Sequence, residues 1–254
     1  MMAQFYRERD SFLHHLDPRV KIVGTILGIA AIMLYNDPTI LIPLFFIFLL
    51  IGVVLGKISV WEQVTLLKPL LPIVVITIII WPLIYKPRFM GVLFGVSFSM
   101  RLLTFALLTF LLLATTSQGD LILGFVKLGM PHEYGLTISI SLRYIPTLYR
   151  LAGTIMDAQK SRGWEVEKGN FITRARKMTA VLIPLLVSSL KTAHDLSIAL
   201  ESRGFGASPK RTFIREIRMG RRDYMVLVLM VVFFVLALYA RYGLDLGHIS
   251  IYPR

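Results

Sequence analysis

The stretch that decides the fold lies between residues 138 and 205, where one tripeptide occurs twice, as Ser161-Arg162-Gly163 and as Ser202-Arg203-Gly204. Each copy follows a long segment with apolar residues at helical spacing, and each precedes an aromatic residue, Trp164 or Phe205. A glycine just after the last helical turn can adopt the left-handed backbone conformation that closes a helix. The repeat therefore predicts two long helices, each of which ends in one arginine and one capping glycine.

The two predicted helices cover about residues 138–160 and 178–200, and each carries one apolar stripe with a polar back. At about 1.5 Å per residue, each would be roughly 35 Å or more long. A shorter helix, about residues 119–128, is expected before them and ends at Gly129-Met130-Pro131. The stripe of the second long helix is formed by residues at steps of three and four, namely Met178, Val181, Leu182, Leu185, Leu186, Ser189, Ala193, Leu196 and Leu200.

The rest of the chain has the composition of a membrane protein. Of its 254 residues, 56% are hydrophobic and only 17% are charged, whereas soluble proteins carry about 25% charged residues. A transmembrane helix needs roughly 20 mostly apolar residues. We therefore predict an all-α membrane protein with about five transmembrane helices, at residues 20–35, 39–56, 69–85, 102–117 and 224–240.

Arg101 sets the expected start of the fourth span. Residues 89–100 are apolar but form only a short run before this charge. They are compatible with a re-entrant or interfacial piece or with the beginning of the fourth span. We favour a span that starts at residue 102, because Arg101 would then lie near its outer end, where a long side chain can reach water.

The distribution of charge predicts three parts and an orientation. Residues 1–118 and 224–254 hold the spans, whereas residues 119–223 form a basic helical domain. Basic residues concentrate on the cytoplasmic side of membrane proteins. One side of the predicted topology collects 23 of the 28 Lys and Arg residues, although Lys86 and Arg88 run against the rule. We expect the N-terminus and residues 119–223 in the cytoplasm of a multi-pass plasma-membrane protein, and the C-terminus outside.

Several kinds of chemistry are not supported by the sequence. The chain has no cysteine, no G-x-x-x-x-G-K-[ST] nucleotide-binding pattern, no H-E-x-x-H and no G-x-S-x-G, so we expect no enzyme, cofactor or metal site. Its five histidines are scattered over different elements. Acidic residues are rare inside the spans, which argues against an ion-coupled carrier. The positive-inside rule accounts for the basic excess without nucleic acid, and residues 210–222 are better explained by attraction to anionic lipid head groups.

The repeated arginines have two interpretations. A cation at the end of a helix is favourable to the helix dipole, so Arg162 and Arg203 could be solvated caps and nothing more. The same serine, glycine and following aromatic residue at both sites favour a shared binding role. An arginine can pair with a carboxylate through two hydrogen bonds, so the two tips predict docking to two similar acidic grooves on a partner.

Four short motifs, taken together in their order, link the chain to a known family. The sequence resembles the transmembrane T component of energy-coupling factor (ECF) transporters, which includes the cobalt-transport permease of that class. The resemblance extends over nearly the whole chain. It is carried by His15-Leu16-Asp17-Pro18-Arg19-Val20-Lys21, by Thr115-Thr116-Ser117 leading to Asp120-Leu121, by Met130-Pro131 and by the paired Ser-Arg-Gly ends.

The resemblance implies a non-catalytic coupling subunit of an ABC-type importer. It implies docking of Arg162 and Arg203 into two ATPase subunits, with Ser161, Gly163, Ser202 and Gly204 shaping the helix ends. It further implies contact with a small substrate-binding membrane subunit, the S component, which carries a vitamin or a transition metal such as cobalt or nickel. The transported substrate is not encoded in this chain if the S component selects it.

Two other kinds of protein are alternatives to this interpretation. A stand-alone channel or carrier would need a polar pathway through the spans, and the sequence offers little beyond Arg101 and scattered Thr and Ser. A membrane-tethered binder of lipid or nucleic acid would explain the basic charge. It would give no reason for the repeated tripeptide.

Overall fold

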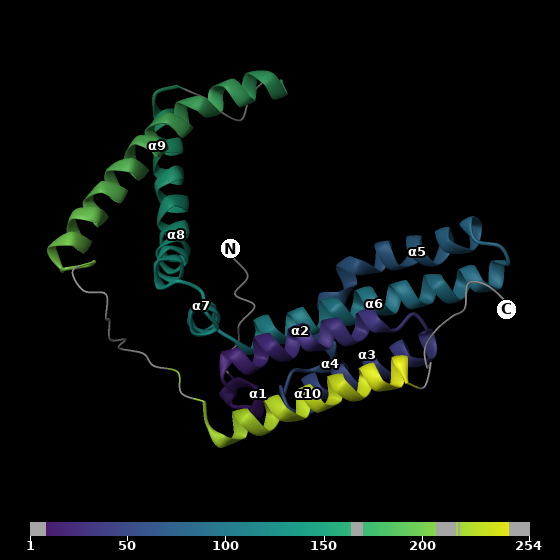
Figure 1. The fold of residues 1–254 in the computed structure, drawn as a ribbon. Coiled ribbons are helices and arrows are strands. Elements are labelled where there is room, and N and C mark those ends of the chain that lie inside the picture. Colours follow the sequence, from purple (N-terminus) through teal and green to yellow (C-terminus); the bar gives the residue numbers. More distant parts are fainter. Residues whose placement is uncertain (1–8, 164–169, 207–216, 218, 244–254) are drawn as a thin grey trace. The chain divides into compact units, whose positions relative to one another are not determined.

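A computed structural model of the chain describes residues 9–163, 170–206, 217 and 219–243, without the side chains of residues 171–176. All regular elements in these ranges are helices (Figure 1), which confirms the prediction of an all-α protein. The chain divides into two compact units, Met1–Met130 together with Ile217–Arg254, and Pro131–Glu216. Residues 119–130 belong to the first unit, whereas the charge pattern placed them in the predicted basic domain. Whether residues 119–223 act together as a functional domain stays a prediction.

The first unit contains most of the apolar helices. Asp17 and Asp37 cap two of them, because their carboxylates accept hydrogen bonds from the backbone N–H of Arg19 and Thr39, and a proline occupies the first helical position of each. The elements of this unit are α1 (Phe12–His15), α2 (Pro18–Leu34), α3 (Pro38–Val54), α4 (Val60–Leu67), η1 (Lys68–Leu70), α5 (Leu71–Ile84), α6 (Arg88–Thr115), α7 (Gln118–Lys127) and α10 (Arg221–Tyr242).

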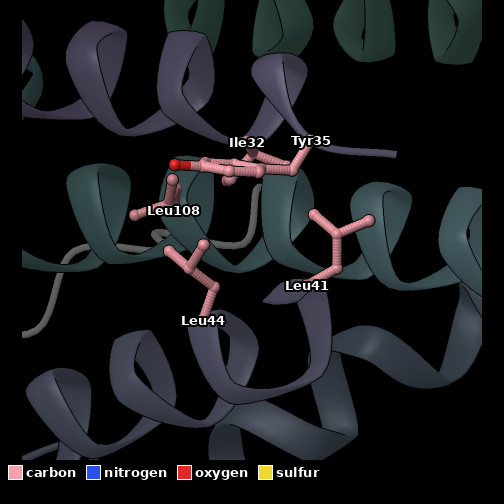
Figure 2. Close-up of a cluster of buried hydrophobic side chains, with 5 residues drawn as sticks. All are labelled: Ile32, Tyr35, Leu41, Leu44 and Leu108. Carbon is pink, nitrogen blue, oxygen red and sulfur yellow. The ribbon is translucent and has the colours of Figure 1, made fainter. Parts of the chain in front are cut away.

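Helix α6 is the centre of this unit. It packs against α2, α3, α4 and α5 and contributes to each of three buried apolar clusters. Figure 2 shows one of them, in which Leu108 of α6 meets Leu41 and Leu44 of α3 and the end of α2 at Ile32 and Tyr35. The tyrosine also donates a hydrogen bond to the carbonyl of Ala237, with an O···O distance of 2.7 Å, and so ties α2 to α10.

Helix length and apolar composition support a membrane location. Among the described residues, four stretches are long and apolar enough to cross a membrane, and α3 is a shorter apolar helix. The expected number of about five spans is approximate. The four stretches are Val60–Ile84, Arg88–Thr115, Lys177–Ser202 and Arg221–Tyr242.

The expected start of the fourth span at residue 102 was wrong. Helix α6 runs without interruption from Arg88, so residues 89–100 are its first half and Arg101 lies in its interior. The guanidinium donates hydrogen bonds to the carbonyl of Tyr35, at 2.7 Å, and to the side-chain oxygen of Asn36, at 2.6 Å. It also lies over the ring of Phe98. Because the α2–α3 turn supplies two hydrogen-bond acceptors for the guanidinium, the helix can continue past this charge.

The second unit consists of two long helices, α8 (His132–Ser161) and α9 (Phe171–Ser202). Both begin several residues before the predicted ranges. They pack against each other (Figure 1), and the side chain of Gln159 donates a hydrogen bond to the carbonyl of Ala180 at 3.3 Å. The end of α8 therefore contacts the first half of α9.

Candidate docking site

The end of α9 has the complete hydrogen-bond pattern of a Schellman motif. The backbone N–H of Gly204 donates to the carbonyl of Glu201, and that of Phe205 donates to the carbonyl of Leu200, both at 2.9 Å. These bonds satisfy carbonyls that the end of a helix leaves without partners. Gly204 has a φ of +73°, in the left-handed region that favours glycine.

The end of α8 repeats this backbone conformation. Arg162 has φ −83° and ψ 8°, and Arg203 has φ −87° and ψ 7°. Gly163 has a φ of +79° and donates to the carbonyl of Lys160 at 2.9 Å. The predicted closure of both helices by glycine is thus confirmed. Trp164, which follows the first copy, lies outside the described residues.

The two serines bond within their own helices. The hydroxyl of Ser161 donates to the carbonyl of Asp157, and that of Ser202 donates to the carbonyl of Ala199, both at 3.0 Å. Each serine is therefore a partner for carbonyls of the last turns, where the helix has fewer backbone donors. The hydroxyls support the helix end from which the neighbouring arginine projects.

The two arginines are exposed and far apart. Within the described part of the chain, neither guanidinium has an ion pair or hydrogen bond to another side chain. Arg162 follows the turn of α8 that contacts Ala180. At about 1.5 Å per residue, Arg203 lies roughly 35 Å further along α9. One small acidic site would be too short to contact both tips.

The capping glycine of α8 gives a first prediction. A Cβ added at Gly163 would meet no neighbouring atom, so Gly163→Ala acts only through the positive φ. We expect it to lower the stability of this helix end by roughly 1–2 kcal/mol, the usual cost of a left-handed residue with a side chain. Gly153→Ala in the interior of α8 also meets nothing, and we expect a gain of up to about 1 kcal/mol because alanine favours helix.

Hydrogen exchange of the amides in the last turn of α8 measures this effect. Exchange should become faster in Gly163→Ala and should stay the same or slow down in Gly153→Ala. Equal protection in the two variants would show that the left-handed glycine does not stabilise the helix end.

Two structurally important groups were not predicted from the sequence. One is the pair Gly91 and Gly95 on α6, which allows close approach of α5. The other is a buried charged cluster at the beginning of α2, where Asp17 and Lys21 are less than 8% exposed. The available signals were the glycine spacing and two charges at the edge of an apolar run. Neither signal identifies the residues that lie opposite in the fold.

Among the described residues no group of His, Cys, Asp or Glu is arranged to hold a metal ion.

The fold and the two helix ends define a class: an all-α membrane protein that presents two similar cationic tips. The family model described as cobalt transport protein (CbiQ) matches residues 9–213. The energy-coupling factor transporter transmembrane protein EcfT of Acidaminococcus fermentans is 33% identical, covering 96% of this chain and 97% of its own length. The EcfT proteins of Lactococcus lactis and Staphylococcus aureus are 32% and 31% identical and cover 93% and 91% of this chain, with 96% and 95% of their own lengths.

The chain therefore belongs to the cobalt transport protein family, as a transmembrane T component of the energy-coupling factor transporter type. This finding confirms the family to which the sequence motifs pointed.

Proposed function

We propose that this chain is the non-catalytic coupling subunit of an ECF-type importer, in which it links two ABC-type ATPase subunits to a substrate-binding S component. ATP hydrolysis then takes place on the partner subunits, and the S component selects a vitamin or a transition-metal ion. The observation that carries this proposal is the pair of long helices that end in the same exposed Ser-Arg-Gly cap.

The geometry of the tips supports docking to two ATPases. Each arginine lies at a helix end that is closed by a left-handed glycine, and this order of the backbone reduces the entropy lost when the arginine is bound. Charge-assisted pairing with a carboxylate is strong and directional. The separation of roughly 35 Å along α9 suits two grooves on two subunits, one for Arg162 and one for Arg203.

The exposed side of α9 supports contact with a membrane subunit. Part of the predicted stripe, including Val181 and Leu185, is half-buried, whereas other large apolar side chains of this helix are 53–71% exposed. An exposed apolar patch of this kind marks a protein or membrane contact. We assign it to the S component. The side chains are Met178, Leu182, Ile183, Leu186, Val187 and Leu190.

The arrangement of the first unit is consistent with the orientation expected from charge. Helices α2 and α10 begin side by side, where the backbone N–H of Asp17 donates to Asp223. Helix α6 ends there as well, because Lys21 contacts the carbonyl of Thr115. We propose that this end faces the cytoplasm and that the C-terminus of the chain is outside.

Reconstitution in liposomes tests the proposed function. We expect the purified chain alone to give no uptake of labelled cobalt, nickel or vitamin above that of empty liposomes. Addition of its ATPases and an S component should give uptake that requires ATP, since the chain itself holds no nucleotide-binding motif. Uptake by the chain without partners would contradict the proposal and favour the stand-alone carrier.

A further inference from the structure

A cluster of buried charges lies at one end of the first unit. Asp17, Lys21 and Asp223 are only 4%, 7% and 8% exposed. Buried charges are costly unless they are paired and hydrogen-bonded, so their partners indicate what holds this region together. The chain leaves the first unit after Met130 and returns to it at Ile217. Both connections start from helices that contact this cluster.

Lys21 binds the C-terminal end of α6, which leads through α7 to the second unit. Its ammonium group donates to the carbonyl of Thr115, the last residue of α6, at 2.9 Å, and to the carbonyl of His14, at 3.1 Å. A cation at the C-terminal end of a helix is also favourable to the helix dipole. Helix α7 begins three residues later, and Ser117 caps it by accepting from the N–H of Asp120.

Helix α7 itself rests on the first turns of α2. The two helices pack against each other. A Cβ placed on Gly124 would lie 3.2 Å from the Cβ of Pro18 and 3.0 Å from the Cδ1 of Ile22. A glycine permits this close approach, whereas a Cβ here would require its neighbours to shift by a few tenths of an ångström.

The returning connection is fastened to the same turn of α2. One carboxylate oxygen of Asp223 accepts from the backbone N–H of Asp17 at 2.9 Å, and the other accepts from that of Gly220 at 2.8 Å. The guanidinium of Arg19 donates to the carbonyl of Ile217 at 3.3 Å. The first residues after the second unit are thus bonded to residues 17–19.

Three carboxylates compensate part of the cost of burying this charge. Burial disfavours the charged form of the Lys21 ammonium group, and the carboxylates of Asp120, Asp17 and Asp223 partly offset this effect. These belong to the N-terminal ends of three different helices, α7, α2 and α10. One buried cation therefore lies near the starts of α2, of the helix that precedes the second unit in the chain and of the helix that follows it.

We propose that residues 17–22 form a rigid anchor that holds both connections to the second unit, and that Lys21 and Asp223 are positioning residues for coupling. The inference rests on the proposed function, in which ATPase closure moves the second unit. The part of this movement that reaches the first unit along the chain passes through these two connections. If they slipped relative to α2, ATP hydrolysis would move the second unit without a matching movement of the transporter. A rigid anchor lets the movement of the second unit produce a matching movement of the first unit.

Loosening the anchor gives the first test, made in the reconstituted complex of chain, ATPases and S component. Lys21→Met removes the ammonium group and keeps an unbranched chain of similar length. We expect complex recovery and ATP hydrolysis within about twofold of wild type, and uptake per ATP hydrolysed reduced about tenfold. Lys68→Met, which changes an exposed lysine of the same unit, should leave this ratio unchanged.

The ratio of uptake to ATP hydrolysis distinguishes a positioning role of Lys21 from a role in the stability of the fold alone. A purely structural role would lower recovery, hydrolysis and uptake together. An unchanged ratio in Lys21→Met would overturn the inference.

Locking the anchor gives a second test that does not depend on the folding of Lys21→Met. The chain has no cysteine, so Pro18→Cys with Gly124→Cys introduces a single possible disulfide. The two Cβ atoms would lie 3.2 Å apart, and a shift of a few tenths of an ångström brings them to the usual separation of about 3.5–4.5 Å. A rigid anchor predicts the same uptake per ATP with and without reductant. Loss of uptake on oxidation, with recovery on reduction, would show that α7 moves on α2 and would overturn the inference.

The wild-type complex distinguishes failure of the proposed function from failure of the anchor inference. Absence of ATP-dependent uptake by the wild-type complex would overturn the proposed function and the anchor's role with it. An active wild-type complex together with an inactive oxidised Pro18→Cys/Gly124→Cys variant would overturn the anchor alone.

Discussion

Reversing the charge of both helix tips, as Arg162→Glu with Arg203→Glu, is expected to abolish co-purification of the ATPases with this chain. Removing one partner of a buried, hydrogen-bonded charge pair costs roughly 2–5 kcal/mol, and about 1.4 kcal/mol corresponds to a tenfold change in affinity. Each reversal should therefore weaken its own site by about 30-fold or more. Each single variant should retain one intact tip and lose only part of the ATPase.

The measurement is the amount of ATPase recovered with the affinity-tagged chain, together with ATP-dependent uptake. Arg150→Glu with Lys191→Glu is a matched control, because it makes the same change of charge at exposed positions of α8 and α9 away from the tips. The control should keep most of the recovery. Normal recovery and uptake in the double tip variant would show that the arginines are solvated caps without a docking role.

Replacing Gly91 by leucine is expected to disrupt the packing of α5 on α6. A Cβ at this position would lie 2.6 Å from the Cα of Pro82, 2.8 Å from the carbonyl oxygen of Trp81 and 2.9 Å from the nitrogen of Pro82. These are backbone atoms, which cannot move aside as the end of a side chain can. Overpacking in well-packed regions usually costs 1–3 kcal/mol. We expect Gly91→Ala in that range and Gly91→Leu at or above about 3 kcal/mol.

Thermal unfolding in detergent, followed by tryptophan fluorescence, measures this effect, because Trp81 stacks on Phe98 across the α5–α6 contact. Gly119→Leu is the control, since a Cβ there meets no atom. Gly95→Ala should lie between the two, with its nearest backbone atoms at 3.2 and 3.3 Å. An unchanged unfolding temperature in Gly91→Leu would show that the two helices are not held at this distance.

Glycine spacing alone did not reveal which pair matters for close packing. The pair Gly24 and Gly28 has a spacing that can let another helix approach closely, but it faces Met230 and Leu108, which are side chains that can shift. Gly91 and Gly95 have the same spacing and face backbone. The spacing places two glycines on one side of a helix, but it does not say what lies opposite. That depends on how the neighbouring helix packs.

Arg101 shows the same limit for charge. A single arginine after a short apolar run suggested the end of a span, because a charge in the membrane is expensive. The carbonyl and amide oxygens that accept hydrogen bonds from it belong to Tyr35 and Asn36, a long way back along the chain. The cost of a buried charge depends on its partners, and these are known only once α2 and α6 are placed together.

The sequence by itself determined the local features of this protein: its apolar helices, the long amphipathic pair and the closure of that pair by Gly163 and Gly204. Helical periodicity and capping arise from residues within a few positions of each other, so they can be predicted from sequence. Only the tertiary structure decided that α6 continues through Arg101, that Gly91 meets the backbone of α5, and that Asp17 and Asp223 are bonded to each other. These features depend on contacts between distant residues, which exist only after the helices have packed.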